Sequence, residues 1–299
     1  TNGEAIWYRD ARHPLNRSRE IAAFHSPDAL LERLQADTDR ECSQFFTLPD
    51  NPRMRPYQCE ACNAIGNAIV QRQRAMLVAM ATGTGKTFTM VNLIYRLMKA
   101  GVAKRVLFLV DRRALAAQAV RAFASFDTEQ GLKFDKTYEV YSQQFQRGDL
   151  DDDDPFDITA LPNTYLTDPQ PGHAFVYVST IQRMTINLFG KAAASPRTEE
   201  AEEDAEKMEI PIHAFDLIIA DECHRGYTAQ EMSIWRNTLD HFDAVKIGLT
   251  ATPAAHTMAY FRHKVYEYPY ERAVRESYLV DYDLVTIESG VRMQGIFLK

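Results

Sequence analysis

The sequence lacks several features that would place it in a specialised class. No run approaches the ~18 consecutive apolar residues that a membrane-spanning helix requires. No basic segment followed by a short apolar segment begins the chain, so we expect neither a secretory signal nor a membrane contact. The four cysteines show no paired spacing typical of a disulfide framework. These absences favour a protein of the reducing cytoplasm.

The sequence also lacks an excess of basic residues, because its formal net charge is −7. Two stretches account for this deficit: residues 149–157 and 199–206 contain six acids each and no base. Without these twelve acids the net charge would be +5. We interpret them as solvated, acidic insertions near residues 148–171 and 195–211, so the bulk charge does not exclude a nucleic-acid partner.

What the sequence does contain is an alternation of short apolar runs and helical patterns. With 45% hydrophobic residues in 299, the chain has room for one large α/β domain plus appendages. The alternation predicts a mostly parallel sheet with helices on both faces, a three-layer arrangement. The predicted strands are 75–80, 105–110, 138–141, 174–178, 216–220 and 244–249, and the predicted helices are 86–99, 113–126, 181–189 and 229–239.

A glycine-rich loop, residues 81–87, connects the first of these strands to its helix. Gly83 and Gly85 let backbone N–H groups turn toward a phosphate, and the helix N-terminus adds partial positive charge. Lys86 would reach the β- and γ-phosphates of ATP, and the Thr87 hydroxyl would ligate Mg²⁺. The strict pattern begins with Gly or Ala, whereas Met80 stands at that position, and the alternative is a chance Gly/Thr loop. The predicted phosphate-binding residues are Thr82, Gly83, Thr84, Gly85, Lys86 and Thr87.

Two acids, Asp221 and Glu222, follow the apolar run of the strand predicted at 216–220. Asp221 would hold Mg²⁺ through water, and Glu222 would orient and deprotonate the attacking water. His224 would link this nucleotide site to a moving element. The predicted catalytic residues are therefore Lys86, Asp221 and Glu222. The alternative is that the two acids only cap the following helix.

Residues 80–87, 221–224 and 250–253 resemble motifs I, II and III of the superfamily 2 helicases and translocases. Residues 110–112 and 221–226 most resemble the restriction (R) subunit of type I restriction-modification enzymes, although type III and repair helicases share much of the pattern. The resemblance covers about residues 50–285. It implies a RecA-like P-loop NTPase domain, double-stranded DNA as a partner, and association with methyltransferase and specificity subunits.

The resemblance also assigns roles to further residues. Residues 55–58 resemble the adenine-reading element, in which Gln58 offers both a donor and an acceptor and Tyr57 or Arg55 would stack on the base. Thr250 and Thr252 belong to an element that, in the family, communicates between ATP and DNA. Polar side chains after two strands would contact DNA phosphates, with surface solubility or helix capping as the alternative. They are Arg112, Arg113, Thr180 and Gln182.

The resemblance further implies domain boundaries and a function. Residues 1–49 would be the tail of a preceding nuclease domain with a linker, 50–275 the first RecA-like domain, and 276–299 the crossover and start of a second. The implied function is ATP-dependent translocation along duplex DNA before endonucleolytic cleavage. Because the second domain would supply an arginine finger, we expect this chain alone to hydrolyse ATP poorly. Another superfamily 2 helicase and a non-catalytic ATP-binding module that holds a partner subunit stay open.

Cys59 and Cys62 have the spacing of half a zinc site, but Cys42 and Cys223 are isolated residues elsewhere in the chain. We therefore interpret the pair as packed on a helix beside Gln58.

Overall fold

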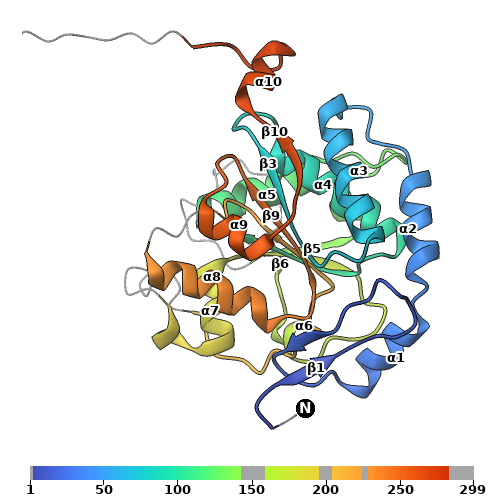
Figure 1. Ribbon diagram of the computed structural model, residues 1–299, viewed down its shortest axis with the longest axis vertical. Coiled ribbons are helices and arrows are strands. Elements are labelled where there is room, and N and C mark those ends of the chain that lie inside the picture. The colour runs from blue at the N-terminus through green and yellow to red at the C-terminus, as the bar shows by residue number, and fades with distance from the viewer. Residues whose placement is uncertain (1–2, 143–158, 195–203, 224–227, 283–299) are drawn as a thin grey trace, which may run out of the picture.

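A parallel β-sheet forms the centre of the protein (Figure 1), in a computed structural model that describes residues 3–142, 159–194, 204–223 and 228–282. Within these residues the sheet has eight strands in the order β10-β3-β9-β8-β4-β7-β5-β6, and every pairing among them is parallel. The carboxyl ends of its strands therefore lie along one edge, where open α/β sheets bind ligands. The strands are β3 (Ala75–Met80), β4 (Arg105–Val110), β5 (Glu139–Ser142), β6 (Thr159–Ala160), β7 (Phe175–Thr180), β8 (Leu217–Ala220), β9 (Val245–Thr250) and β10 (Lys264–Tyr268).

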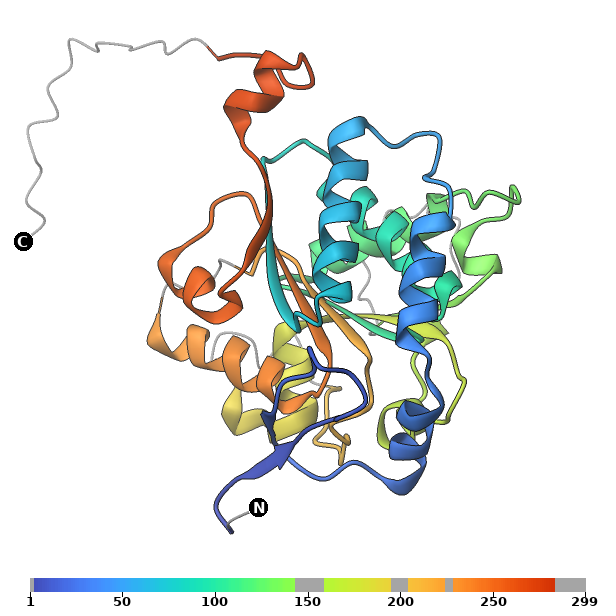
Figure 2. The ribbon, with the colours of Figure 1, turned by 45° about the vertical axis from the view of Figure 1, so that its right-hand side comes forward.

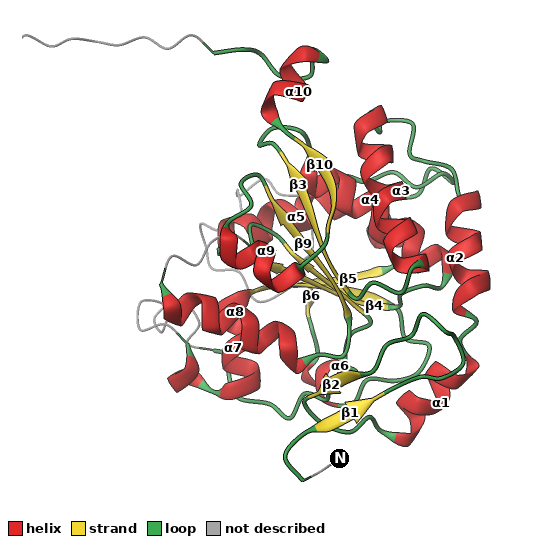
Figure 3. Ribbon diagram, viewed as in Figure 1, coloured by secondary structure: helices red, strands yellow, loops and turns green. Residues whose placement is uncertain are grey.

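Alternate residues of β3, β4, β7 and β8 enter two hydrophobic clusters on opposite faces of the sheet. In β3, Met76 and Val78 lie in one cluster and Leu77 lies in the other. The first cluster is covered by α2 to α5 and the second by α7 to α9, which gives three layers (Figure 2, Figure 3). The helices of this domain are α2 (Thr38–Thr47), α3 (Pro56–Val70), α4 (Lys86–Ala100), α5 (Arg113–Ser125), α6 (Asn163–Thr167), α7 (Ile181–Phe189), α8 (Ala229–His241), α9 (Ala255–Phe261) and α10 (Tyr270–Arg275).

The predicted α/β class is confirmed, and each of the six predicted strands lies within two residues of an observed strand. The predictions omit both edge strands, the two-residue β6 and the longer β10. The sequence of β10 alternates apolar residues with Lys264 and Glu267, which are both exposed, so it has no continuous apolar run. A strand at the edge of a sheet is buried on fewer sides and gives a weaker sequence signal than a central strand.

The first residues of the chain fold against the amino-terminal edge of the sheet, at the bottom of Figure 1. An antiparallel strand pair is followed by a helix that Ser26 caps through its hydroxyl, which accepts from Ala29 N. The elements are β1 (Ile6–Tyr8), β2 (Arg19–Ile21) and α1 (Pro27–Gln35).

Two carboxylates join this segment to the sheet. Asp243 is buried, and it accepts hydrogen bonds from Arg19 Nε at 2.5 Å, Arg74 Nη2 at 2.8 Å and His25 Nε2 at 2.8 Å. Because Arg74 and Asp243 immediately precede β3 and β9, the segment is fixed to the ends of these strands opposite the ligand-binding edge. Glu32 of α1 makes the second link.

Glu32 pairs with the two cations that begin β4. Its carboxylate accepts from Lys104 Nζ at 2.8 Å and from Arg105 Nη2 at 3.0 Å. Burial alone would raise the pKa of Glu32, but the hydrogen bond from Lys104 and the charge of Arg105 lower it to about 2. The carboxylate is therefore ionised in the folded protein at neutral pH.

Helix α2 belongs to the main core. Phe45 is buried against α3, where a Cβ on Gly66 would lie 2.5 Å from the Phe45 ring. The Arg96 guanidinium lies 4.3 Å from the centre of the same ring and donates to Asp50. The predicted boundary at residues 49 and 50 thus runs between elements that share one core.

The predicted acidic insertions are described only in part. Within 148–171, the described portion contains β6 and α6, whose Leu166 is buried. Residues 143–158 and 195–203 lie outside the described residues, as do residues 283–299 of the predicted start of a second domain. Among the described helices, none has the length and apolar character needed to cross a membrane.

Candidate nucleotide site

The phosphate loop has the backbone conformation that its glycines permit. Gly83 and Gly85 both have positive φ, at 84° and 77°, and Gly85 is the residue before the first turn of α4. A Cβ on Gly85 would lie 2.6 Å from Nε2 of Gln58, so a larger residue would clash as well as strain the backbone. The Thr84 hydroxyl donates to the Ala81 carbonyl at 2.6 Å and closes the loop. The loop thus presents the start of α4 to a ligand.

Lys86 and the two predicted acids meet beside this loop. The Nζ of Lys86 donates to the Met80 carbonyl at 3.3 Å and lies 3.7 Å from Glu222 Oε1. Both side chains are largely buried, with 10% and 18% of their surface exposed. Lys86 and Glu222, 136 positions apart in sequence, are therefore in contact because β3 and β8 both pair with β9.

Asp221 is buried at the carboxyl end of β8. Its Oδ1 accepts from the Glu222 backbone N–H at 2.9 Å, and its own N–H donates to Leu109 of β4 at 2.8 Å. Burial raises the pKa of Asp221 to about 6, the neighbouring Glu222 carboxylate adds to the rise, and Lys86 opposes it. A divalent cation bound at this carboxylate would favour its ionised form against both effects. The Thr87 hydroxyl and the Asp221 carboxylate are oxygen donors, which suit Mg²⁺.

The capping alternative for these acids is wrong. Helix α8 begins only at Ala229, and its N-cap is Thr228, which accepts from Glu231 N and completes a capping box. Glu222 instead has a positive φ of 53°, which is uncommon outside glycine. The turn after β8 thus places the Glu222 carboxylate beside Lys86. His224 lies outside the described residues.

At the opposite end of the loop, Tyr57 and Gln58 hold the loop backbone. The Tyr57 hydroxyl and Gln58 Nε2 each donate to the Thr84 carbonyl at 2.9 Å, and Gln58 Oε1 accepts from Arg55 N. Tyr57 is 1% exposed, and its ring stacks on Tyr268 with centroids 3.9 Å apart. In this conformation Tyr57 therefore presents no face to a base, whereas the Arg55 side chain is exposed.

The residues predicted to contact DNA follow neighbouring strands at the same edge of the sheet. Arg112 precedes α5 with 68% of its side chain exposed, and Arg113 begins that helix. Thr180 is buried and caps α7 through its hydroxyl, which accepts from Arg183 N at 3.2 Å. Gln182 lies half-buried in the first turn of α7. Arg112 is thus the most accessible member, and the DNA role of all four stays a prediction.

The third motif, residues 250–253, follows the strand between β3 and β8. Thr250 ends β9 and is buried, and its hydroxyl accepts from the backbone N–H of Thr252 at 3.0 Å. Thr252 is exposed at the start of the turn toward α9. Since β9 lies between β3 and β8, this turn stands between the phosphate loop and Asp221. That position fits the predicted communicating role, which remains a prediction.

Sequence reasoning missed the residues that close the site from the far end of the chain. Tyr268 of β10 covers Tyr57, and Leu279 lies 3.2 Å from the position of a Cβ on Gly83. The only signal was the dense run of tyrosines at residues 266–282, which does not by itself indicate where the rings point.

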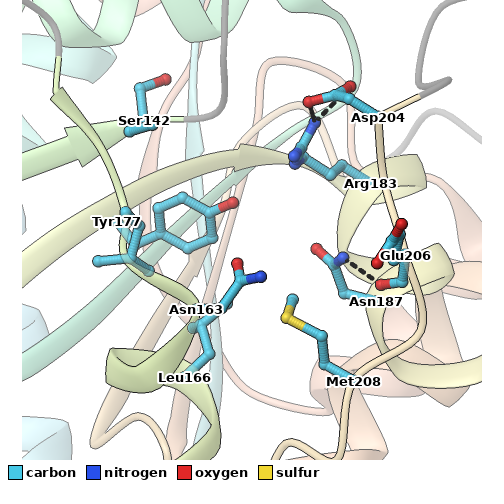
Figure 4. Close-up of a pocket in the computed structure, with 11 residues that line it drawn as sticks. Ser142, Asn163, Leu166, Tyr177, Arg183, Asn187, Asp204, Glu206 and Met208 are labelled. Atoms are coloured by element: carbon cyan, nitrogen blue, oxygen red, sulfur yellow. Dashed lines mark hydrogen bonds and ion pairs between the residues drawn. The ribbon is translucent and has the colours of Figure 1, made fainter.

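A polar cavity of about 230 Å³ lies elsewhere, between β5, β7, α6 and α7 (Figure 4). Asn187 borders it, with Nδ2 donating to the Glu206 carbonyl at 2.7 Å and Oδ1 without a partner among the described residues. Arg183 on its rim pairs with Asp204 at 2.9 Å. The chain on both sides continues into residues outside the described ranges, so we assign the cavity no ligand.

Comparison with known proteins agrees with this geometry. The family described as "Type III restriction enzyme, res subunit" matches residues 51–255, which include the phosphate loop, both acids and the third motif. The chain belongs to this family. It is 36% identical over 316 residues to the type I restriction enzyme EcoKI endonuclease subunit of Escherichia coli (strain K12), covering 98% of this chain and 23% of that protein.

Two further likenesses extend the assignment of this restriction-enzyme homologue. The type I restriction enzyme EcoAI endonuclease subunit of Escherichia coli is 30% identical, covering 99% of this chain and 33% of that protein. The structure of the ATP-dependent Type ISP restriction-modification enzyme LlaBIII bound to DNA matches with a TM-score of 0.52 and 22% identity, over 78% of this chain and 16% of that one, a likeness of fold. The chain is thus homologous to type I endonuclease subunits and spans about a quarter to a third of the length of these relatives.

Proposed function

We propose that this chain is the first motor domain of a type I restriction endonuclease subunit and couples ATP hydrolysis to translocation of duplex DNA. The observation that carries the proposal is the contact of Lys86 with Glu222 beside the buried Asp221, at the ligand-binding edge of the sheet. The expected partners are duplex DNA and the methyltransferase and specificity subunits of a type I complex. The names of the relatives support this assignment.

The proposed chemistry assigns one task to each side chain. Lys86 would bind the β- and γ-phosphates, and the backbone N–H groups from Gly83 to Thr87 would surround them. Thr87 and Asp221 would hold Mg²⁺, which neutralises charge on the phosphate oxygens. Glu222 would orient the attacking water and accept its proton, and its present partner, Lys86, would then turn to the phosphates.

Transmission to DNA would begin at the turn after β9. Thr250 and Thr252 lie between the phosphate loop and the acids, and Arg112, Arg113, Thr180 and Gln182 follow neighbouring strands. A movement of Asp221 and Glu222 after β8 would therefore be transmitted to the proposed DNA surface through the adjacent strands β4 and β7. A second RecA-like domain would have to supply the arginine finger, so we expect slow hydrolysis by this chain alone.

Substitution of Lys86 tests the proposal directly. We expect Lys86→Ala to weaken ATP binding by about 100-fold or more, because a buried cation that pairs with phosphate is lost. Calorimetric titration with MgATP gives the affinity, and circular dichroism checks the fold. Lys133→Ala is the matched control, since Lys133 is exposed and pairs only with Asp127 among the described residues. An unchanged affinity in Lys86→Ala would refute the assignment of the loop.

A further inference from the structure

The segment that follows β10 returns to the nucleotide site. Strand β10 and helix α10 rise above the end of β3, near the top of Figure 1. The chain then brings Leu279 against Gly83 of the phosphate loop and Tyr278 against Tyr57, with ring centroids 4.9 Å apart. The Arg55 guanidinium lies over the Tyr278 ring, 5.1 Å from its centre. One short segment thus contacts both the phosphate end and the predicted base end of the site.

A tight helix end fixes the direction of Tyr278. Ser277 has a positive φ of 62°, the position where helices usually carry glycine. Ser277 N donates to Val274 O at 2.9 Å, and Tyr278 N donates to Ala273 O at 2.8 Å, the bond pattern of a Schellman motif. The Tyr268 hydroxyl also donates to Glu276 at 2.8 Å. The helix end therefore fixes the backbone at Tyr278, and the ring packs against Tyr57 and Arg55.

Tyr278 provides the aromatic surface that Tyr57 does not. Tyr57 is buried, has one face covered by Tyr268, and uses its hydroxyl on the loop backbone. Tyr278 is half-buried, and an exposed, planar guanidinium already rests on its ring. A purine is also a planar π-system, and base–aromatic stacking makes a substantial contribution to nucleic-acid and nucleotide affinity.

The geometry points to Tyr278 as a stacking residue for the purine base of ATP, together with Arg55. This inference rests on the proposed ATP-binding function and extends it to a residue beyond the matched family range of 51–255. The base replaces or joins the Arg55 guanidinium on the ring, beside the amide of Gln58. Leu279 adjoins Gly83, and Tyr278 is its chain neighbour. The segment that would bind the base therefore also contacts the phosphate loop.

The experiment compares a ligand that has a base with one that has only phosphates. Binding of MgATP and of inorganic tripolyphosphate with Mg²⁺ is measured by calorimetry for the 299-residue chain and three variants. Tyr278→Leu keeps apolar bulk but removes the aromatic face, and Tyr278→Phe keeps the face. Tyr282→Leu is the control, because Tyr282 lies on the same segment but is 70% exposed and contacts Tyr270.

We expect Tyr278→Leu to weaken ATP binding about tenfold and to leave tripolyphosphate binding within twofold of the original. Tyr278→Phe and Tyr282→Leu should bind both ligands almost normally. Unchanged ATP affinity in Tyr278→Leu overturns the inference, and so does an equal loss for tripolyphosphate, which would mean that Tyr278 only shapes the loop. Failure of the proposed function looks different, because the unmodified chain would then bind neither ligand and Lys86→Ala would change nothing.

Discussion

At the scale of single residues, Asp243 joins more side chains than its position before a strand suggests. Its carboxylate receives hydrogen bonds from Arg19, His25 and Arg74, and Arg33 lies 3.4 Å away. Burial opposes the charged form, but the hydrogen bond from His25 and the charge of Arg74 hold the pKa of Asp243 far below its ordinary value. The single negative charge of Asp243 thus compensates the positive charges of Arg19, Arg33 and Arg74.

We therefore expect Asp243→Asn to be strongly destabilising, by about 3–5 kcal/mol, because it leaves the partly buried guanidinium groups of Arg19, Arg33 and Arg74 without their buried counter-charge. Urea unfolding followed by circular dichroism measures the change. Asp240→Asn is the matched control, since Asp240 is exposed and asparagine keeps an oxygen that can accept from the Tyr260 hydroxyl, so we expect a cost below about 1 kcal/mol. If the two variants are equally stable, the Asp243 cluster does not anchor the N-terminal segment.

At the scale of elements, helix α1 is attached mainly through charge. Three of its leucines, Leu30, Leu31 and Leu34, are between 44% and 64% exposed, so burial of apolar surface contributes little to its position. Glu32 instead pairs with Lys104 and Arg105 at the start of β4. The stability that α1 adds should consequently depend on pH.

The sign of that dependence follows from the pKa of Glu32, which folding lowers from 4.5 to about 2. The stabilisation is complete above pH 4.5 and is lost as the pH falls toward 2. We expect Glu32→Gln to cost about 2 kcal/mol at pH 7 and progressively less below pH 4.5. Urea titrations of both proteins between pH 7 and pH 3.5 measure the difference. A difference that stays constant across this range would show that the charge of Glu32 contributes nothing.

The elements that the sequence could predict are those whose signal is local. The central strands β3, β4 and β8 are apolar on both faces, and the phosphate loop is contiguous, so neither depends on distant residues for recognition. The contact of Lys86 with Glu222 is consistent with those local signals, because both residues follow strands at the carboxyl edge of one parallel sheet. In contrast, the partners of Asp243 are 169 to 224 residues away, and no local pattern predicts such pairs.

Other features could not be predicted because they depend on backbone conformation. Tyr278 faces the nucleotide site because Ser277 adopts a left-handed conformation, which sequence rules assign to glycine or asparagine. Tyr57 or Arg55 was expected to stack on the base, and the unpredicted strand β10 covers the Tyr57 ring with Tyr268. The burial of Tyr57 therefore depends on an edge strand that the sequence pattern did not indicate.

At the scale of the whole molecule, the family range and the folded unit begin at different places. The family match starts at residue 51, yet α2 packs Phe45 into the main core and β1, β2 and α1 attach through Asp243 and Glu32. Residues 3–49 are consequently part of the structural unit that supports the proposed nucleotide site, even though the proposed chemistry uses none of them.

We expect removal of residues 1–49 to destabilise the domain far more than removal of residues 1–35. The longer deletion takes away Phe45, whose loss alone should cost about 3–5 kcal/mol, and both deletions leave Asp243 with Arg74 as its remaining partner among those described. Thermal unfolding of the two truncated chains beside the full chain measures the steps. A chain starting at residue 50 that melts at the same temperature as the full chain would mean that the N-terminal segment is an independent attachment. The chain starting at residue 36 should have intermediate stability, which would assign separate contributions to α2 and to the charged contacts of α1.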